Sequence, residues 1–434
     1  MKATWKALLA TSLMIAPAAF ATKVPIPVEG ASLNVSVQVQ TQAMITENGA
    51  PNGTDTAYDV FVRRTRLLVN GDISQNFTYL LQIDNANFGK FGNFTGRAIV
   101  QDAWVGWAPT GITGGNVLYI DAGILLIPIS RHFLVSTTNF ITADAHVDEF
   151  RFPANPFPAN RDTGIQLRGW WLDKKIGFRG GVYEGYAPVD QNGTAQTAAS
   201  TCTPAGTGCI TPKRYPQFAG FVNFDVIGSE EGGWLYGAYK WAKDPVFSIG
   251  VSGVYQSQAI RNTAINAGGN ITDQKLASAD IYLNLPQGEA AELVVEATGY
   301  LSGNGTGNPN TGKGFFADIA YRFGFVAPYA SYSYFQADDC PTDGSLTTAQ
   351  LNTCNAGITG NGSVNSRNFK AGLNFFFNKN LNHLNLEFQS NHGLSAYGPQ
   401  AINAGNAGYA PAGITTSLRT PAQKSFLAHW NVLF

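Results

Sequence analysis

Apolar and polar side chains alternate at every second position in segment after segment of this 434-residue chain. In 276–285 the odd positions are apolar, and the even positions from 278 to 284 carry hydroxyl, carboxylate or amide groups. Segments 33–45, 369–377 and 425–434 follow the same pattern. A strand places successive side chains on opposite faces, whereas a helix repeats every 3.6 residues. The sequence therefore predicts an all-β protein whose strands have one apolar face.

The scarcity of charge indicates which way the apolar faces point. Charged residues make up 13% of the chain, against roughly 25% in soluble domains, which is too few to cover a soluble body. With 28 Lys+Arg and 29 Asp+Glu there is no basic surplus, so nucleic acid is not an expected partner. Beyond the N-terminus no run approaches the ~20 apolar residues of a spanning helix. A membrane β-barrel needs strands of only ~9–11 residues, and we expect this architecture.

Residues 1–21 have the features of a secretory signal peptide. Two lysines precede an apolar run over 7–16, and an A-x-A cleavage motif ends at Ala21. We therefore expect residues 22–434 to form a single exported barrel domain.

The chain has four cysteines, and an exported protein permits disulfides. Three connectivities are open, and pairing between neighbours in sequence is the simplest of them. That pairing would join Cys202 to Cys209 and Cys340 to Cys354. A zinc site is disfavoured because no histidine lies near these cysteines.

Short and long connections alternate along the chain, which is typical of outer-membrane barrels with short periplasmic turns and long outer loops. Short connections are expected at 73–75, 109–115, 173–174, 286–288, 324–326 and 378–381. Long connections are expected at 47–57, 87–97, 127–160, 187–213, 259–274, 302–312, 337–365 and 393–420.

Counting strands between these connections gives seventeen candidates, an odd number that cannot leave both chain ends on the periplasmic side. The weakest candidate is 233–243, and keeping it would move 259–274 to the short-turn side. We therefore interpret 228–244 as a long periplasmic excursion and expect a sixteen-stranded antiparallel barrel. A barrel of this size leaves an aqueous channel.

If the apolar positions face lipid, the alternate positions line the lumen. The basic residues at lumenal positions include Arg64, Arg66, Arg168 and Arg179 on the early strands. Carboxylates dominate the late strands, although Asp84 and Asp102 lie early. Two interpretations stay open: a polarised pore that orders ions by charge, or neutralising wall pairs such as Arg64 or Arg66 with Asp84.

Arg63 occupies an odd position, whereas its basic neighbours Arg64 and Arg66 occupy even positions, so the alternation places Arg63 on the opposite, lipid-facing side of the strand. A charged side chain on the lipid face is costly near mid-bilayer. We therefore expect Arg63 near the outer rim, where its long side chain can reach the headgroups.

The connection 127–160 combines many large apolar groups with charged ones, which a loop dangling in water would not carry. We expect it to fold into the lumen and narrow it, presenting Arg131, Asp144, Asp148, Glu149 and Arg151 to the solute. His132, Asp144, His146 and Asp148 could also suggest a metal or acid–base site. Their spacing matches no defined site, and no catalytic or phosphate-binding motif occurs. We expect no cofactor and no enzymatic activity.

Several motifs occur in an order that resembles the outer-membrane porins of the phosphate-selective O/P type, over most of the mature chain. They are Arg63-Arg64-Thr65-Arg66-Leu67, Val69-Asn70-Gly71, Tyr79-Leu80-Leu81-Gln82-Ile83-Asp84, Gln101-Asp102-Ala103-Trp104-Val105, Gly123 to Pro128, Arg161-Asp162-Thr163-Gly164-Ile165-Gln166-Leu167, and the terminal Phe434.

The resemblance implies a sixteen-stranded homotrimeric diffusion channel whose third loop forms the constriction. It also implies that the last strand, ending at Phe434, is presented to the barrel assembly machinery. Phosphate-selective members are expected to have arginine ladders and lysine rings in the constriction. Segment 127–160 contains no lysine, and its bases Arg131 and Arg151 face three acids. Strict anion selectivity is therefore not implied.

The sequence as a whole predicts a Gram-negative outer-membrane porin for passive diffusion of small hydrophilic solutes and ions. The most specific form of this prediction adds a preference for phosphate-like anions. Its expected partners are outer-membrane lipid and lipopolysaccharide. A non-conducting or plugged barrel that acts as a binding scaffold or adhesin is the alternative, and a barrel enzyme is the weaker one. Conductance of the purified protein separates the three.

Overall fold

The computed structural model describes most of the chain between residues 22 and 434. The described residues are 22–24, 30–50, 54–74, 76–90, 94, 96, 98–109, 117–146, 161–185, 215–230, 234–241, 243–262, 270–306, 311–340, 342–343, 346–352, 365–394 and 419–434. The expected signal peptide over 1–21 lies outside them.

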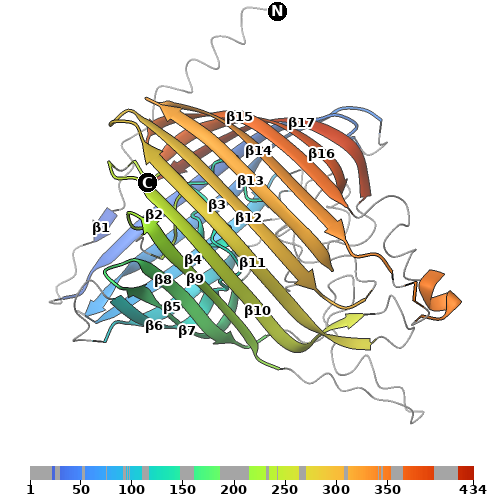
Figure 1. Ribbon diagram of the computed structural model, residues 1–434. Helices are drawn as coiled ribbons and strands as arrows, with labels where there is room; N and C mark the ends of the chain where they lie inside the picture. The colour runs from blue at the N-terminus through green and yellow to red at the C-terminus, as the bar shows by residue number, and fades with distance from the viewer. Residues whose placement is uncertain are drawn as a thin grey trace, which may run out of the picture.

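Sixteen long antiparallel strands run obliquely around one barrel (Figure 1). They are β2 (Leu33–Thr46), β3 (Ala57–Ser74), β4 (Phe77–Phe88), β5 (Ala98–Trp107), β6 (Val117–Leu126), β7 (Arg161–Trp171), β8 (Ile176–Tyr183), β9 (Gln217–Ile227), β10 (Val246–Asn262), β11 (Asn270–Pro286), β12 (Ala291–Gly303), β13 (Gly312–Phe323), β14 (Val326–Ala337), β15 (Ser366–Asn378), β16 (Asn382–Leu394) and β17 (Arg419–Leu433).

Each of these strands pairs with its sequence neighbour, and the last pairs with the first to close the ring. At the closure Ser425 on β17 faces Thr46 on β2, and Leu433 faces Gln38. A three-residue strand, β1 (Thr22–Val24), pairs with β2 from Val35 to Leu33, on the N-terminal side of the stretch of β2 that pairs with β17. The prediction of a sixteen-stranded antiparallel barrel is confirmed.

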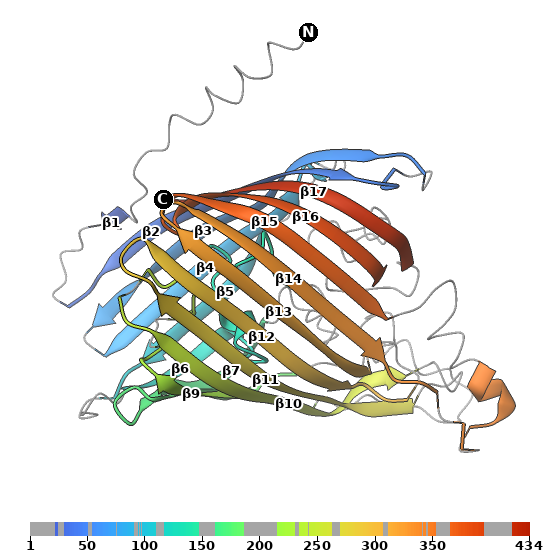
Figure 2. The same ribbon diagram turned by 45° about the horizontal axis from the view of Figure 1, so that its top comes forward.

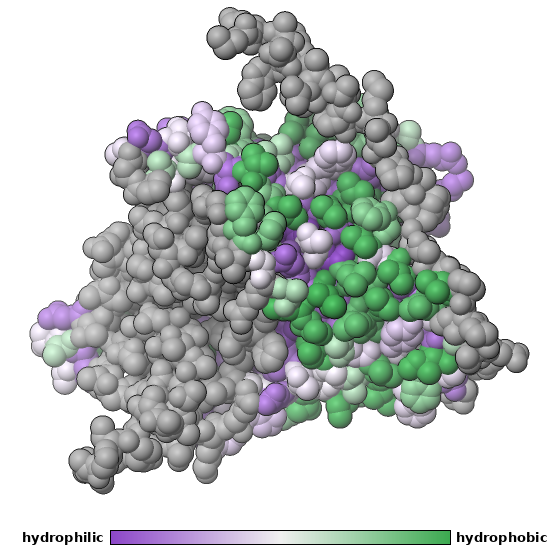
Figure 3. All heavy atoms as spheres, turned by 180° about the vertical axis from the view of Figure 1, so that it is seen from behind, coloured by the Kyte–Doolittle hydropathy of each residue, from purple (hydrophilic) through white to green (hydrophobic). Residues whose placement is uncertain are grey.

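The barrel is apolar outside and polar inside, as the alternation predicts. On β11, Ile281 is 47% exposed, whereas Asp280 and Asn284 are buried. On β17, Phe426 is 62% exposed, whereas His429 and Asn431 are buried. Seen from behind, a broad area of apolar side chains covers the right-hand part of the outer wall (Figure 3). Because a soluble protein buries such residues, this inverted arrangement indicates that lipid covers the wall.

The connections also follow the predicted alternation in length. Short turns join β3 to β4, β7 to β8 and β13 to β14, at the end of the barrel where Phe434 lies (Figure 2). One boundary differs from the prediction. β10 and β11 run on to Asn262 and from Asn270, past a register irregularity between Gln256 and Ile260, so much of the expected loop 259–274 is strand. The bulge lets the ladder continue beyond the point where the strict alternation fails.

No helix among the described residues has the length and apolar character required to cross a membrane.

Candidate functional site: the barrel interior

The described part of the long connection after β6, residues 127–146, contacts the inner wall on several sides of the barrel; we call it the inward segment (Figure 2, teal). His132 Nδ1 lies 3.2 Å from Glu296 Oε1 on β12, and His146 Nε2 lies 2.9 Å from Asp318 Oδ1 on β13. Farther along, Gln40 on β2 donates to the Thr137 carbonyl at 3.0 Å. The segment therefore reaches from the β12–β13 wall to β2, six strands around the ring.

Asp144 ties the inward segment to the arginine-rich strand β3. Arg63 Nε donates to Asp144 Oδ2 at 2.7 Å, and Arg64 Nη2 donates to Asp144 Oδ1 at 2.7 Å. Burial alone would raise the pKa of Asp144, but Arg63 and Arg64 outweigh it and hold that pKa well below its ordinary value. Asp144 is therefore a fixed anion that neutralises part of the basic wall.

The expectation that Arg63 lies at the outer rim on the lipid side is wrong. The β2–β3 register shifts between Gln40 and Thr41, so Gln40 faces Arg64, Thr41 faces Val62, and Arg63 is left as the extra residue. A bulge turns the extra residue out of the strict alternation. Arg63 consequently points into the barrel, where Asp144 is its partner.

Because the pKa of Asp144 is depressed in the folded protein, its ion pairs stabilise the fold above the unfolded value of about 3.8 and are lost only as the pH falls through the lower folded value. We expect Asp144→Asn to lower the free energy of unfolding by about 2 kcal/mol. This deficit should stay constant from pH 8 to about 5 and shrink below about 4. Urea unfolding in lipid vesicles at each pH measures it, and a deficit that disappears near pH 6 would contradict the assignment.

The other lumenal arginines of the early strands are also engaged. Arg66 Nε donates to Asp84 Oδ2 at 2.9 Å, which confirms the expected wall pair, and Arg168 Nε donates to Asp121 Oδ2 at 2.6 Å. Arg179 differs, since its described hydrogen bond goes to the Trp234 carbonyl, at 2.7 Å, and its guanidinium stacks over the Trp234 ring. Most of the basic side chains therefore carry a local counter-charge.

Arg131 forms the most enclosed charge cluster of the interior. Its Nε donates to Glu230 Oε1 at 2.8 Å, and its Nη1 lies 3.1 Å from Glu296 Oε1. Its guanidinium carbon lies 3.6 Å from the centre of the Tyr282 ring, a cation–π contact. Burial opposes the charged form, but the two carboxylates outweigh it and raise the pKa of Arg131 above its ordinary value. Arg131 thus links the inward segment to β12 and to the connection after β9.

That connection was predicted as a periplasmic excursion over 228–244, and its described residues form no strand between β9 and β10, as predicted. The predicted location outside the barrel is wrong. Its described residues 234–241, which we call the second segment, pack inside the barrel. Tyr282 on β11 donates to the Ala238 carbonyl at 2.6 Å, and Asn374 on β15 donates to Tyr239 Oη at 3.1 Å. The aromatic side chains of this stretch would be costly in water, and the lumen gives them cover.

The two segments contact each other in the middle of the barrel. Val135 forms an isolated parallel bridge with Tyr236, and the Asn139 carbonyl accepts from the Ala238 backbone. Gly237 permits this approach, since a Cβ there would lie 2.1 Å from Asn139 Nδ2. Together the segments reduce the open cross-section that a sixteen-stranded barrel would otherwise have.

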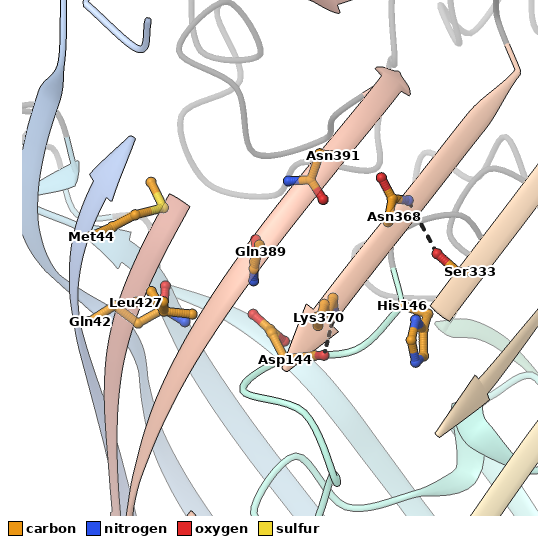
Figure 4. Close-up of a pocket in the computed structure, with 10 residues that line it drawn as sticks. All are labelled: Gln42, Met44, Asp144, His146, Ser333, Asn368, Lys370, Gln389, Asn391 and Leu427. Atoms are coloured by element: carbon orange, nitrogen blue, oxygen red, sulfur yellow. Dashed lines mark hydrogen bonds between the residues drawn. The ribbon is translucent and has the colours of Figure 1, made fainter. Parts of the chain in front are cut away.

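A small pocket, most of whose lining residues are polar, lies against the inward segment on the side of the long connections; we call it the vestibule (Figure 4). Four amides from β2, β15 and β16 line it, with Ser333, Asp144, His146, Lys370, Met44 and Leu427. The amides are Gln42, Asn368, Gln389 and Asn391. Lys370 Nζ lies 3.5 Å from the Asp144 carbonyl, and Asn368 donates to Ser333 at 3.2 Å. The side-chain amides give this small pocket both hydrogen-bond donors and acceptors.

The described part of the chain does not include all of the predicted residues. Asp148, Glu149 and Arg151 of the predicted constriction lie outside the described residues, and so do Cys202, Cys209 and Cys354. Cys340 is buried in the apolar cluster against which Leu346 and Leu351 pack. The disulfide pairing stays a prediction. Within the described part of the chain, His, Cys, Asp and Glu form no group that could hold a metal ion.

The partners of Arg131 and Arg179 on the connection after β9 were not predicted from the sequence. Glu230 and Trp234 were assigned to a periplasmic excursion and so were not considered as interior groups. A signal was present, because Trp234, Leu235, Tyr236, Tyr239 and Trp241 give this connection the same excess of large apolar groups as 127–160. That excess indicates a connection that packs against something.

Comparison with solved structures places this architecture among outer-membrane proteins. The model is similar to the outer-membrane expressed OmpT of Vibrio cholerae, with 8% sequence identity and a TM-score of 0.51 over 94% of this chain and 99% of that one. It is similar to Salmonella typhi OmpF, solved with daunomycin, with 11% identity and a TM-score of 0.52 over 95% and 100%. The outer membrane channel DcaP of Acinetobacter baumannii gives 11% and 0.50 over 96% and 100%.

No protein-family model and no curated protein sequence matches the chain. At these identities the structural likeness defines the fold alone, and the chain shares that fold with these outer-membrane proteins. The protein is a closed barrel of sixteen antiparallel strands, and its outer face is apolar. Together with the shared fold, these features define a multi-pass β-barrel of the outer membrane.

Proposed function

We propose that the protein is a porin through which small hydrophilic solutes and ions diffuse passively. The observation that carries this proposal is the polar interior: amide, hydroxyl and charged side chains line the vestibule and surround the inward segment. A barrel that only anchored a scaffold would have no need of a hydrophilic lining of this extent. The inward segment would form the narrow part of the route, as the resemblance to the O/P-type porins implies.

We further propose a weak preference for cations in place of the anion preference that the resemblance suggests. Asp144 pairs with Arg63 and Arg64, Asp84 with Arg66, and Asp121 with Arg168. Among the described side chains of the interior, thirteen carboxylates and eight lysines or arginines are buried, and three further bases, Arg63, Arg161 and Lys240, also pair with interior carboxylates. Since these residues face the interior, the surplus carboxylates favour cations there.

Conductance of the purified protein in planar lipid bilayers tests both statements. We expect stepwise, ohmic channels, and a small reversal potential of cation-selective sign in a KCl gradient. Protein denatured by boiling is the control and should give no steps. Folded protein that never conducts would sink the porin proposal, and an anion-selective reversal potential would sink the charge argument alone.

The resemblance supports two proposals about assembly. We propose that three barrels form a homotrimer, which blue-native electrophoresis and crosslinking would detect.

We also propose that the last strand is presented to the assembly machinery through Phe434. That residue is 44% exposed, and its backbone N–H and carbonyl both bond to Val37. Phe434→Ala, which keeps these two backbone hydrogen bonds, should therefore reduce insertion more than it reduces the stability of barrels already inserted.

A further inference from the structure

At the short-turn end of the barrel, inward-facing side chains are exposed on one side of the interior and covered on the other. Strands β2, β12 and β14 all begin at this end. The partly exposed side chains lie on β2 and on its partner β3, and they are Asn34, Ser36, Leu68 and Asn70. The covered ones lie on β12 and β14, are at most 1% exposed, and are Glu292, Val294 and Ala327. Water therefore enters this end of the interior on the side of β2 and β3.

The second segment covers the opposite side. The rings of Tyr239 and Trp241 lie edge-to-face against Phe376 on β15, with centroids 4.9 and 5.1 Å apart. Tyr239 shares one buried apolar cluster with inward-facing side chains of β12 to β15, which are Val294, Ala320, Ala327 and Phe376. Apolar side chains at inward positions depart from the alternation and would be costly against water. This patch therefore indicates that the wall is built to carry the second segment.

Polar contacts fix the second segment across the mouth. Trp241 Nε1 donates to Asn380 Oδ1 at 3.1 Å, and Asn380 Nδ2 donates to the Tyr239 carbonyl at 3.2 Å, in the turn between β15 and β16. At its other end, Trp234 is held by Arg179 on β8. The described hydrogen bonds of the second segment go to β8, β9, β11, β15, this turn and the inward segment, and none goes to β2 or β3.

On the open side, the inward segment reaches the wall at Thr137. Arg66 Nη1 donates to Thr137 Oγ1 at 2.6 Å, and Gln38 Nε2 donates to the same oxygen at 3.3 Å. Gln38 and Arg66 form the next inward-facing pair after Ser36 and Leu68, and both are buried. The open side therefore runs from the pair of Ser36 and Leu68 to a closed contact at Thr137.

We propose that solutes cross the short-turn half of the barrel away from its axis, along β2 and β3, and that the second segment closes the rest of the mouth. Ser36 and Leu68 line this route. Thr137, held against Gln38 and Arg66, sets its width and so determines the size of the solutes that pass. The proposal rests on the proposed function, because it locates the route of a channel and assigns the residues that select solutes in it.

Cysteine labelling of the folded protein tests the two sides with a matched pair of variants. Ser36→Cys and Val294→Cys each replace the fourth residue of a strand that begins at the short-turn end. We expect a positively charged methanethiosulfonate to modify Ser36→Cys about tenfold faster or more, because a covered thiol reacts only during local opening. The unsubstituted protein reports any reaction of its own four cysteines. Equal rates in the two variants would overturn the proposal.

A third variant tests whether the second segment is the cover. Adding Tyr239→Ala plus Trp241→Ala to Val294→Cys should raise its labelling rate close to that of Ser36→Cys, since the covering rings are lost. A folded triple variant, verified by its heat-dependent electrophoretic mobility, that still labels slowly would contradict the assignment of the cover.

Single-channel recordings then test the route itself. Modification of Ser36→Cys should lower the conductance by about a third or more, since the added group narrows the route. The same treatment should leave the conductance of Val294→Cys near its starting value. An unchanged conductance in fully labelled Ser36→Cys would overturn the off-axis route. Labelling requires no current, so unsubstituted protein that never conducts but labels as expected would count against the porin proposal and leave the cover standing.

Discussion

Replacing residues 134–144 with Gly-Ser-Gly is expected to raise the single-channel conductance about two-fold or more, since the narrowest water-filled section limits the current. This stretch carries the inward segment from the β12–β13 wall to β2. Its ends already meet, because the His146 backbone donates to His132 Nε2 at 3.2 Å and the two rings lie 5.1 Å apart. A short linker can therefore join them without moving a strand. Planar-bilayer recordings measure the change.

Removal of residues 305–309 from the outer connection between β12 and β13 is the matched control and should leave the conductance near that of the wild type. The difference in electrophoretic mobility between heated and unheated protein verifies that each barrel is folded. A folded 134–144 variant with wild-type conductance would show that the narrow section lies elsewhere.

The second large effect is expected on stability. Arg131→Met should lower the free energy of unfolding by about 3–5 kcal/mol, because it leaves Glu230 and Glu296 buried without the guanidinium between them. Methionine fills a similar apolar volume, so the loss reports the charge more than the packing. Urea unfolding in lipid vesicles, followed by tryptophan fluorescence, gives the value.

Two comparisons make this measurement specific to the buried cluster. Lys243→Met breaks an exposed pair with Glu289, and we expect it to cost less than about 1 kcal/mol. Adding Glu230→Gln to Arg131→Met should recover part of the loss, since one unpaired carboxylate is removed. Equal losses in Arg131→Met and Lys243→Met would mean that the buried cluster does not hold the interior together.

The outline of the barrel could be predicted from the sequence because two local signals agree. Alternation over segments such as 276–285 assigns a strand and also assigns its faces, since the period of two permits one sorting of side chains. The connection lengths then set the number of strands and the common side of the two ends. Neither signal depends on contacts between distant parts of the chain.

The face on which Arg63 lies could not be predicted from the alternation. The alternation assigns it to the outer face, and a single extra residue in β3 reverses that assignment. Bulges depend on the register with the neighbouring strand, which the residues of one strand do not specify. The choice of Asp144 as partner for Arg63 and Arg64 likewise depends on how the inward segment crosses the lumen.

The arrangement of the interior had the weakest basis in sequence. The excess of large apolar side chains in 127–160 predicts that this connection folds inward. The connection 228–244 has the same excess, with Trp234 and Tyr239 among its residues, and could have been predicted to fold inward as well. The pairing of Arg131 with Glu230 joins residues 99 positions apart. Such pairs follow from the closed shape, which brings connections from distant hairpins into one confined volume.

The meeting of Val135 with Tyr236 has a consequence for how the molecule matures. Val135 lies on the connection after β6, at the end of the barrel with the long connections, which we expect to cross the bilayer. Tyr236 lies on the connection after β9, at the opposite end, which we expect to stay in the periplasm. Their contact requires hairpins on both sides of β8 to have reached full depth. A barrel halted during insertion would therefore have an unfilled centre, and a protease added from either compartment would cut its inner chains.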